Sequence, residues 1–321
     1  MRDFLKPNVI VSKCLGFEAC RYNGQVIRDD FVKSLEKHVN YVPVCPEVAI
    51  GLGIPRFPVR IVASDSVSLI QHSTNTNLTN VMNDFSERFL SELKDVDGFI
   101  LKNRSPSCGI NDVKVYRLAE RPVSLGKSSG FFGGKVLARF AGLAIEDEGR
   151  LKSYTIREHF LTKLFSLTSF RGVRKSDKMS ELVRFHTNNK FLLMSYGQKD
   201  LRILGNIVAN HERKDPVQVM QDYEKAIRNT MENPPKATNR INVLMHIFGY
   251  FSKELSGEEK RFFSETVELY REGRIPFISA LTMLRSWAIR FGDDYLMYQS
   301  YFEPYPDDLM ELSDAGRKLE L

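Results

Sequence analysis

The first half of the chain alternates short apolar runs with stretches of helical periodicity. Its four apolar runs, rich in β-branched residues, are residues 9–11, 41–44, 60–63 and 98–101. Such runs, bounded by polar and turn residues, are typical of buried strands. The apolar residues from Leu78 to Val96 recur at helical spacing, and the segment from Gly133 to Gly142 predicts a second, shorter helix. Strands that alternate with helices favour a three-layer α/β domain with a mostly parallel sheet.

The second half has few turn residues and long segments with a period of 3.6 residues. The candidate helices are residues 155–170, 178–195, 199–212, 215–232, 237–255, 257–272 and 276–291. The Pro234-Pro235 pair and Gly257 indicate breaks between them. A short polar stretch at residues 146–150 separates the two patterns. We therefore expect an α/β domain over residues 1–150 and an all-α domain over residues 151–321.

Composition narrows the class of protein. Hydrophobic residues make up 42% and charged residues 27% of the 321 positions, which is typical of a globular chain. No apolar run reaches the roughly 18–20 residues that span a bilayer, and the N-terminus shows no signal-peptide pattern, so we expect a cytoplasmic protein without a membrane partner. The net charge of +6 suits an anionic partner without requiring one. No protein partner can be deduced.

Three of the four cysteines share one local context. Cys14 follows the first apolar run, Cys45 follows the second, and Cys108 lies in the loop after the fourth. Because the carboxyl ends of parallel strands meet at one edge of a sheet, where ligands bind, we expect these three thiols to converge. A disulfide framework is not expected in a cytoplasmic chain of this size.

The spacing of the cysteines limits the chemistry. A structural zinc site requires paired C-x2-C or C-x2-H spacings, and a ferredoxin-type cluster requires a compact cysteine run; neither occurs. Dispersed cysteines are compatible with a [4Fe–4S] cluster, and three ligands would leave one iron open as a Lewis acid. Cys20 does not follow a strand; as a fourth ligand it would close the cluster and favour a redox or structural role. Each cysteine alone is also compatible with a buried apolar position.

The segments around the cysteines resemble a known family. They are residues 12–24 (S-x-C-L-G-x3-C-R-Y-N-G), 45–56 (C-P-E-x3-G-L-G-x-P-R) and 102–109 (K-x2-S-P-S-C-G). In order and approximate spacing they resemble the signature blocks of the thiouracil desulfidase (TudS) family, with Asn23 in place of the family's aspartate. The second half resembles the YbgA-type helical domain of longer members. The whole is similar to the tRNA 4-thiouridine desulfidases (RudS).

The resemblance implies a cofactor and a reaction. It implies a [4Fe–4S] cluster with one open iron on Cys14, Cys45 and Cys108, and Cys20 is the weaker ligand candidate because members do not all carry a cysteine there. The implied activity is the non-redox, hydrolytic desulfuration of 4-thiouridine, in tRNA, to uridine and sulfide. The alternatives are desulfuration of free thiouracil, or a non-catalytic metal- or RNA-binding protein.

Glu47, Ser105 and Ser107 are the candidate catalytic residues. Glu47 lies two residues after Cys45 and would activate the attacking water and pass on its proton. The two serines flank Pro106 next to Cys108 and would hydrogen-bond the base or the developing charge. The alternative roles are a turn residue or a partner of Arg56 for Glu47, and turn stabilisation for the serines.

Basic residues in the same blocks and beyond them indicate anionic or carbonyl-bearing ligands. The candidate substrate contacts are Arg21, Arg56, Lys102 and Arg104, with ordinary surface charge or a salt bridge as the alternative. Residues 152–190 carry nine basic side chains against three acidic ones. The densest part of this segment contains the candidate RNA contacts Arg171, Arg174, Lys175 and Lys178. They would neutralise tRNA phosphates, whereas a solvated helix face is the other interpretation.

Overall fold

The structure is a computed structural model that describes residues 2–64, 66–117 and 123–311. Its contacts divide the chain into two compact units, and the division falls within one long helix, after Leu164. The first unit begins at Lys6. The second contains the described residues from Phe165 onward together with the first few residues of the chain. The predicted domain boundary at residue 150 stays a prediction.

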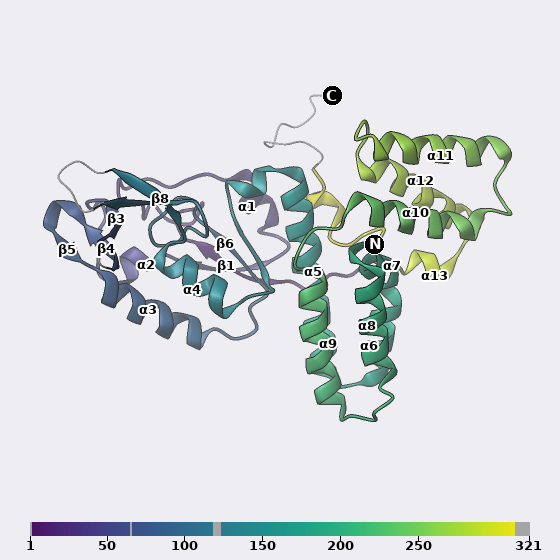
Figure 1. Ribbon diagram of the computed structural model, residues 1–321, viewed down its shortest axis with the longest axis horizontal. Coiled ribbons are helices and arrows are strands. Elements are labelled where there is room, and N and C mark those ends of the chain that lie inside the picture. The colour runs from purple at the N-terminus through teal and green to yellow at the C-terminus, as the bar shows by residue number, and fades with distance from the viewer. Residues whose placement is uncertain (1, 65, 118–122, 312–321) are drawn as a thin grey trace. The chain divides into compact units, whose positions relative to one another are not determined.

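A four-stranded parallel sheet forms the centre of the first unit (Figure 1). In spatial order its strands are β2 (Asn40–Val44), β1 (Asn8–Ser12), β6 (Gly98–Leu101) and β9 (Ala144–Asp147). Three of them were predicted from their apolar runs, and β9 includes part of the polar stretch taken as the domain boundary. The chain passes from β1 through α1 (Asp30–Leu35) to β2, and later reaches β6 on the other side of β1. The order of strands therefore reverses at β1, which makes its carboxyl end the expected ligand position.

Helical segments cover both faces of this sheet. Alternate residues of a strand point to opposite faces, and β6 shows both sides. A Cβ on Gly98 would lie 2.8 Å from a methyl group of Leu164 in α5 (Tyr154–Ser176). Phe99 packs with its ring 4.9 Å from that of Phe140, at the end of α4 (Phe131–Arg139). The predicted three-layer α/β arrangement is confirmed.

A second, five-stranded sheet was not predicted. In order it contains β5 (Thr76–Asn77), β4 (Val67–Gln71), β3 (Val59–Ala63), β7 (Val113–Arg117) and β8 (Ser124–Ser128). Its pairs are antiparallel except β3 with β7. The run at residues 60–63, expected in the parallel sheet, belongs to this mixed sheet.

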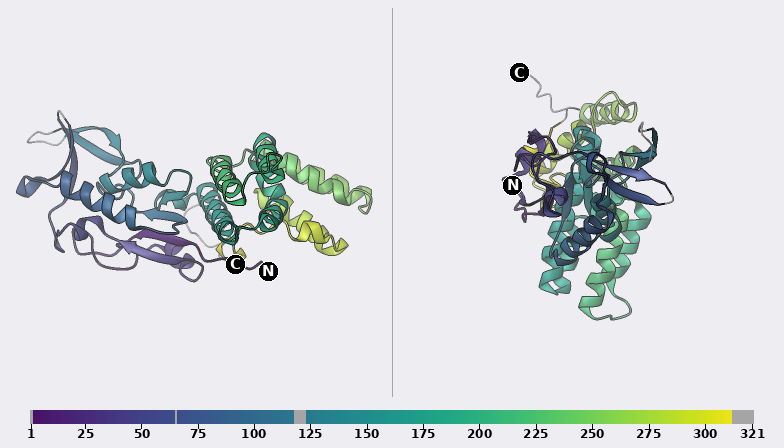
Figure 2. Two further views of the ribbon diagram at one scale, coloured as in Figure 1. Left: turned by 90° about the horizontal axis from the view of Figure 1, so that it is seen from below. Right: turned by 90° about the vertical axis from the view of Figure 1, so that its left-hand side faces the viewer.

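Helices pack on one face of the mixed sheet. The buried side chains on that face form one cluster with residues of α3 (Thr79–Glu92) and of the loop after α2 (Pro46–Ala49). Its members include Ile61, Leu69, Val113 and Met82. Figures 1 and 2 show α3 running along the sheet on this side, with the opposite face uncovered by helices of the first unit. The layer of α3 and α4 therefore packs against both sheets.

The second unit is helical, as predicted. Its further helices are α6 (Met179–Asn188), α7 (Lys190–Tyr196), α8 (Gln198–Ala209), α9 (Pro216–Thr230), α10 (Ala237–Phe251), α11 (Gly257–Arg271), α12 (Phe277–Phe291) and α13 (Asp294–Met297). A large buried cluster around Trp287, Phe251 and Phe263 forms its core. No helix in the described part of the chain is long and apolar enough to span a membrane.

One predicted helix of this unit is two helices. The periodicity favoured a single helix over 178–195, but the structure interrupts it at Asn189. The buried Asn189 amide donates to the Phe185 carbonyl at 2.8 Å and accepts from the Ser300 hydroxyl at 2.6 Å. Asparagine competes for backbone groups and so favours a break. Ser300 is distant in sequence, so its contribution was not visible in the local pattern.

Candidate functional site

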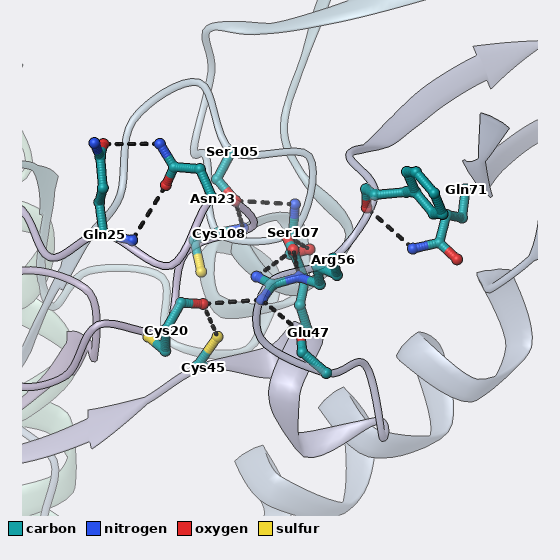
Figure 3. A network of polar contacts seen from close by, with 12 residues as sticks. Cys20, Asn23, Gln25, Cys45, Glu47, Arg56, Gln71, Ser105, Ser107 and Cys108 are labelled. Carbon is teal, nitrogen blue, oxygen red and sulfur yellow. Dashed lines mark hydrogen bonds and ion pairs between the residues drawn. The ribbon is translucent and has the colours of Figure 1, made fainter. Parts of the chain in front are cut away.

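The carboxyl edge of the parallel sheet brings the cysteines together. Cys14 follows β1, Cys45 follows the neighbouring β2, and Cys108 lies in the loop after β6 on the other side of β1. Figure 3 shows Cys20, Cys45 and Cys108 side by side, with Glu47 and Arg56 next to them. All four thiols are free; Cys20 and Cys108 are buried, and Cys14 and Cys45 are partly exposed. The convergence expected from the strand ends is present, while the ligand roles stay predictions.

The thiols contact one another, and these contacts and burial favour the neutral form of three of them. Hydrogen bonding to Cys14 raises the pKa of Cys20 to about 11. A hydrogen bond with Cys20, followed by burial, raises the pKa of Cys45, and burial raises that of Cys108. Cys45 also lies close enough to Cys108 for their charges to interact. Cys20, which was the weaker ligand candidate, thus lies in contact with two of the three predicted ligands.

The Cys108 loop is held by two serine hydroxyls. The Ser105 hydroxyl accepts from the backbone nitrogens of Ser107 at 3.3 Å and Cys108 at 3.1 Å, which is the turn-stabilising role. The buried Ser12 hydroxyl, at the end of β1, accepts from the Lys102 nitrogen at 2.8 Å. Both Ser12 and Ser105 hydrogen-bond the Cys108 thiol and lower its pKa against the larger effect of burial. Ser12 was part of the sequence block but was not recognised as a site residue.

Glycines at the start of α4 let that helix approach the Cys108 loop. A Cβ on Gly130 would lie 2.5 Å from the Ser107 carbonyl oxygen. The nitrogens of Phe131 and Phe132 donate to the carbonyls of Pro106 at 3.0 Å and Ser107 at 2.9 Å. The free N–H groups of a helix N-terminus are thereby satisfied by the cysteine loop. The glycine-rich start of α4 therefore also anchors the loop that carries Cys108.

Glu47 lies between a serine and an arginine. Its Oε1 accepts from the hydroxyl of the fully buried Ser107 at 2.9 Å. Its Oε2 accepts from Arg56 Nε at 2.8 Å and lies 2.7 Å from Arg56 Nη2. The side chains of Arg56 and Glu47 are only 6% and 12% exposed, so the ion pair is shielded from water. This fork fixes the orientation of the carboxylate.

Arg56 also joins the cysteine loops. Its Nη1 donates to the Cys20 carbonyl at 2.9 Å and to the Gly53 carbonyl at 3.3 Å. One guanidinium group thus connects the loop after β1, the carboxylate next to Cys45 and the turn that precedes β3. With most of its donors used, Arg56 positions other residues, and its predicted contact with the substrate stays untested.

Lys102 forms a second polar cluster at the same edge. Its ammonium group pairs with Glu148 and contacts the Asn103 side chain, and the Asn103 nitrogen donates to Glu148 at 2.7 Å. The pair is largely buried, with 18% and 7% of the two side chains exposed. Glu148 follows β9 and was missed, because the sequence placed this segment at a domain boundary. Only the pairing of β9 with β6 reveals it.

The other two predicted substrate contacts are near the surface. Arg104 is 76% exposed and pairs with Asp112 at 3.1 Å. Arg21 is half-buried and stacks over the Tyr22 ring at 5.7 Å from its centroid. Both lie in loops that carry a cysteine, and neither is held as firmly as Arg56 or Lys102.

The predicted RNA contacts lie at the end of α5 and in the turn after it. Lys175 and Lys178 are exposed and Arg171 is half-buried, whereas Arg174 pairs with Glu224 at 2.7 Å. Two further basic residues of the 152–190 segment, Arg157 and Lys163, are buried at 3% and 7% exposure and are not available to a phosphate. The surface charge of this segment is therefore smaller than its sequence indicates.

The donor set fits a sulfur-ligated cluster. Among the residues that the structure describes, no three histidine, cysteine or carboxylate side chains are placed to bind a single metal ion. Thiols from separate loops suit a cluster of several irons, in which each iron takes its own cysteine. Cys14, Cys45 and Cys108 supply such a set from three adjacent strands. The first unit is thus an α/β domain with a thiol-lined ligand site at its topological switch point.

Comparison with known proteins identifies both parts of the chain. Residues 9–148 match the family model described as 2-thiouracil desulfurase, and residues 190–306 match one described as a protein of unknown function, DUF1722. The first part of the chain is thus similar to thiouracil desulfurase-type domains, and the second part is similar to YbgA-like DUF1722 domains.

Individual relatives cover one part each. The uncharacterized protein YbgA of Escherichia coli (strain K12) is 24% identical over 148 residues, 46% of this chain and 88% of its own length. The uncharacterized protein YbbK of Bacillus subtilis (strain 168) is 29% identical over 109 residues, 32% of this chain and 72% of its own. A solved structure, a [4Fe-4S]-dependent thiouracil desulfidase TudS, is 28% identical with a TM-score of 0.37, covering 46% of this chain and 93% of that one.

Proposed function

We propose that this protein removes sulfur from a thiolated pyrimidine in a non-redox reaction that depends on a [4Fe–4S] cluster, with 4-thiouridine in tRNA as the substrate. The observation that carries the proposal is the convergence of three free thiols from adjacent parallel strands beside a fixed carboxylate. The match of residues 9–148 to the 2-thiouracil desulfurase family supports the same chemistry.

Cys14, Cys45 and Cys108 would hold the cluster. When bound, the cluster would supply an iron without a protein ligand, and such an iron is a Lewis acid that polarises a thiocarbonyl group. Burial favours the neutral thiol at Cys108, and metal ligation requires the thiolate, so loading releases protons. The hydrogen bonds of Ser12 and Ser105 to Cys108 favour the thiolate and ease this step.

Glu47 would activate the attacking water. Its Oε2 accepts from two Arg56 nitrogens and its Oε1 from the Ser107 hydroxyl, which leaves the second lone pair of Oε1 for the proton of a bound water. Water adds to C4 of the base, Glu47 takes its proton, and the C–S bond then breaks as the carbonyl forms. The sulfur leaves as sulfide, which takes up the protons of the consumed water. Carbon and sulfur keep their oxidation states, so no electron donor is required.

Free thiouracil is the second candidate substrate. The description of the matching family names 2-thiouracil, a free base, which favours this alternative. The two candidates share the chemistry of the site and differ in the size of the substrate.

The test uses protein purified without oxygen. Iron and sulfide are measured first, and the near-ultraviolet absorbance of thiouridine in bulk tRNA and of free 4-thiouracil and 2-thiouracil is then followed over time. We expect iron-loaded protein to decrease the near-ultraviolet absorbance of thiolated tRNA and to release sulfide. Bleaching of the free bases alone would assign the second candidate. A loaded protein that bleaches none of them would refute the proposed activity.

The Glu47→Gln variant tests the role of the carboxylate. It retains the Ser107 contact and the size of the side chain, so we expect a normal iron content with strongly reduced turnover. Arg88→Gln, which changes an exposed residue of α3, is the matched control. Full turnover by Glu47→Gln with an intact cluster would show that another group activates the water.

A further inference from the structure

The open face of the mixed sheet carries a row of basic side chains. Lys114 in β7 lies directly opposite Lys127 in β8. Arg60 in β3 is next in the same row, because Arg60 and Lys114 immediately precede the paired residues Ile61 and Val115. All three alternate with residues of the packed face and therefore point away from it. We call Arg60, Lys114 and Lys127 the cationic row.

Few acidic groups oppose this charge. The described strands of the mixed sheet contain four basic residues, the cationic row and Arg117, and no acidic one. Asp112, just before β7, pairs with Lys127 and with Arg104 at 3.1 Å. Arg104 belongs to the loop that leads to Cys108, so the row continues toward the cysteine site. Lys114 is exposed and Arg60 half-buried.

An aromatic ring lies within the row. The guanidinium of Arg60 is 5.5 Å from the centroid of the Tyr116 ring, and Tyr116 is half-buried on the same face. Cations along a surface, combined with an aromatic ring that a base can stack on, are typical of sheets that bind single-stranded nucleic acid. The ring offers a stacking surface for a base, and an acidic protein or a lipid headgroup has no base to stack on it.

The row is unfavourable for the folded chain by itself. Like charges directly opposite one another in an antiparallel pair destabilise a sheet, and Lys114 and Lys127 are such a pair, in which the contact of Lys127 with Asp112 offsets only part of the repulsion. The packed face needs neither of them. An anionic ligand on the open face would turn this repulsion into attraction.

We propose that the cationic row and Tyr116 form a binding surface for the phosphate backbone of an RNA strand. The proposal rests on the proposed function and deepens it, because it assigns recognition of a polynucleotide substrate to the desulfurase-type domain itself. The lysines contact phosphates, Arg60 contacts a phosphate while it stacks on Tyr116, and the ring takes one base. The row, and not only the helical segment around Arg171, then accounts for the preference for RNA over the free base.

The experiment compares two charge-matched double variants of the cluster-loaded, full-length protein. Arg60→Gln/Lys114→Gln removes two charges from the row. Arg88→Gln/Lys94→Gln removes two exposed charges on or just after α3, the helix on the packed side of the sheet. Binding of bulk tRNA is measured over a series of salt concentrations, and turnover is measured with thiolated tRNA and with 4-thiouracil.

We expect the row variant to bind tRNA roughly tenfold more weakly at low salt, with a salt slope reduced by about 1.4–1.8, because each lost phosphate contact removes about 0.7–0.9 from the slope. Turnover of 4-thiouracil should equal that of the wild type. The α3 variant and the charge-preserving Arg60→Lys/Lys114→Arg variant should retain both affinity and slope. Lys114→Gln alone, which relieves the like-charge pair, should fold with an unchanged or higher Tm. Its reduction of the salt slope should be about half of that of the double variant.

Equal tRNA affinity and salt slope for the row and α3 variants would overturn the proposal. So would a row variant that loses binding to phosphatidylserine vesicles but not to tRNA, since the face would then be a lipid surface. A different result would refute the proposed function alone. In that case the loaded wild-type protein would convert neither thiolated tRNA nor the free bases, while the row variant would still bind tRNA more weakly.

Discussion

The two sheets of the first unit differ in what they bury and what they present. The strands of the parallel sheet contain no basic residue and two acidic ones, Glu146 and Asp147, within their described ranges. Helical segments cover both of its faces, and its loops carry the cysteines. The mixed sheet packs one face and exposes the other, and its strands carry four basic residues and no acidic one.

The comparison separates the chemistry of the site from the recognition of the ligand. A sheet that is buried on both faces can offer ligands only at its edge, where the strand ends converge. A sheet with one open face offers a broad surface. In this chain the edge bears thiols and a carboxylate, and the surface bears cations. The following predictions test this division, from the largest expected effect to the smallest.

Replacement of a predicted ligand at the parallel sheet edge should have the largest effect. Cys45→Ser should lose most of the iron and sulfide and all measurable desulfuration, because a serine oxygen is a poor ligand for soft iron. Cys20→Ser is the matched comparison and should retain the iron, since Cys20 is not an expected ligand. Iron and sulfide analysis after anaerobic purification checks both. Loss of iron from Cys20→Ser instead would indicate a closed, four-cysteine site.

Loss of the Glu47 carboxylate should reduce kcat by roughly 10²–10⁴-fold, the usual contribution of a positioned general base. The iron content of Glu47→Gln should stay at the wild-type level, because Glu47 is not among the expected ligands. Single-turnover measurements with thiolated tRNA give the rate. A change confined to KM would contradict the role in water activation.

Arg56 should act through the residues that it holds. Arg56→Lys keeps the charge but loses the fork to Glu47 and the bond to the Cys20 carbonyl. We expect kcat to fall about 10–100-fold, as for other groups that orient ligands. Iron retention should fall about tenfold or less. Iron release to a chelator over time is the readout beyond activity. Arg104→Lys, at an exposed pair, should change neither quantity.

Core truncation should distinguish the two sheets by their burial. Ile10 in β1 is 1% exposed, so Ile10→Ala should destabilise the protein by about 2–5 kcal/mol. Ile70 in β4 is half-buried on the open face of the mixed sheet, and Ile70→Ala should cost less than about 1–2 kcal/mol. Urea unfolding of both variants measures the difference. Equal losses would show that the open face is covered in solution.

Two aspartates should respond to pH in opposite directions. Burial raises the pKa of Asp147 above its usual 3.8, so its stabilising contribution decreases as the pH rises from about 3.8 through the raised value. Hydrogen bonds with Lys127 and Arg104 lower the pKa of Asp112, so its contribution is lost as the pH falls below about 3.8. The Tm of Asp147→Asn should rise relative to that of the wild type as the pH increases from about 4 to 6. Below about pH 4, the Tm of Asp112→Asn should fall less with decreasing pH than that of the wild type. Parallel curves for all three proteins would contradict both assignments.

The local pattern of apolar residues was sufficient to predict the elements that are buried along most of their length. β1 and β6 are continuous apolar runs because both of their faces are covered, and the helices of the second unit show clear periodicity. β2 was found from its apolar composition, although most of its residues are exposed. The mixed sheet was largely missed for the opposite reason. In β7, Lys114 and Tyr116 alternate with Val113 and Val115, and in β8 most positions are exposed. Short alternating strands with an open face resemble loops in a single sequence.

The candidate site was predictable as a set of strand ends but not as a set of contacts. The position of Cys14, Cys45 and Cys108 after apolar runs was enough to place them at one edge. The bonds of Ser12 to Cys108, of Arg56 to Glu47 and of Lys102 to Glu148 join segments between 9 and 96 residues apart. The pair of Arg56 and Glu47 was one of the alternatives given by the sequence. No local signal records the other two pairs, so residues like Ser12 and Glu148 emerged only from the fold.

The sequence by itself determined the strands β1, β2 and β6, most helices of the second unit, and that three cysteines follow strands, because burial and hydrogen bonding act through local patterning. The tertiary structure alone decided that Cys20 contacts two of these thiols, that Ser107 also holds Glu47, and that three cations align on one sheet face. Those outcomes depend on strand order and register, and both are set by packing between segments that are distant along the chain.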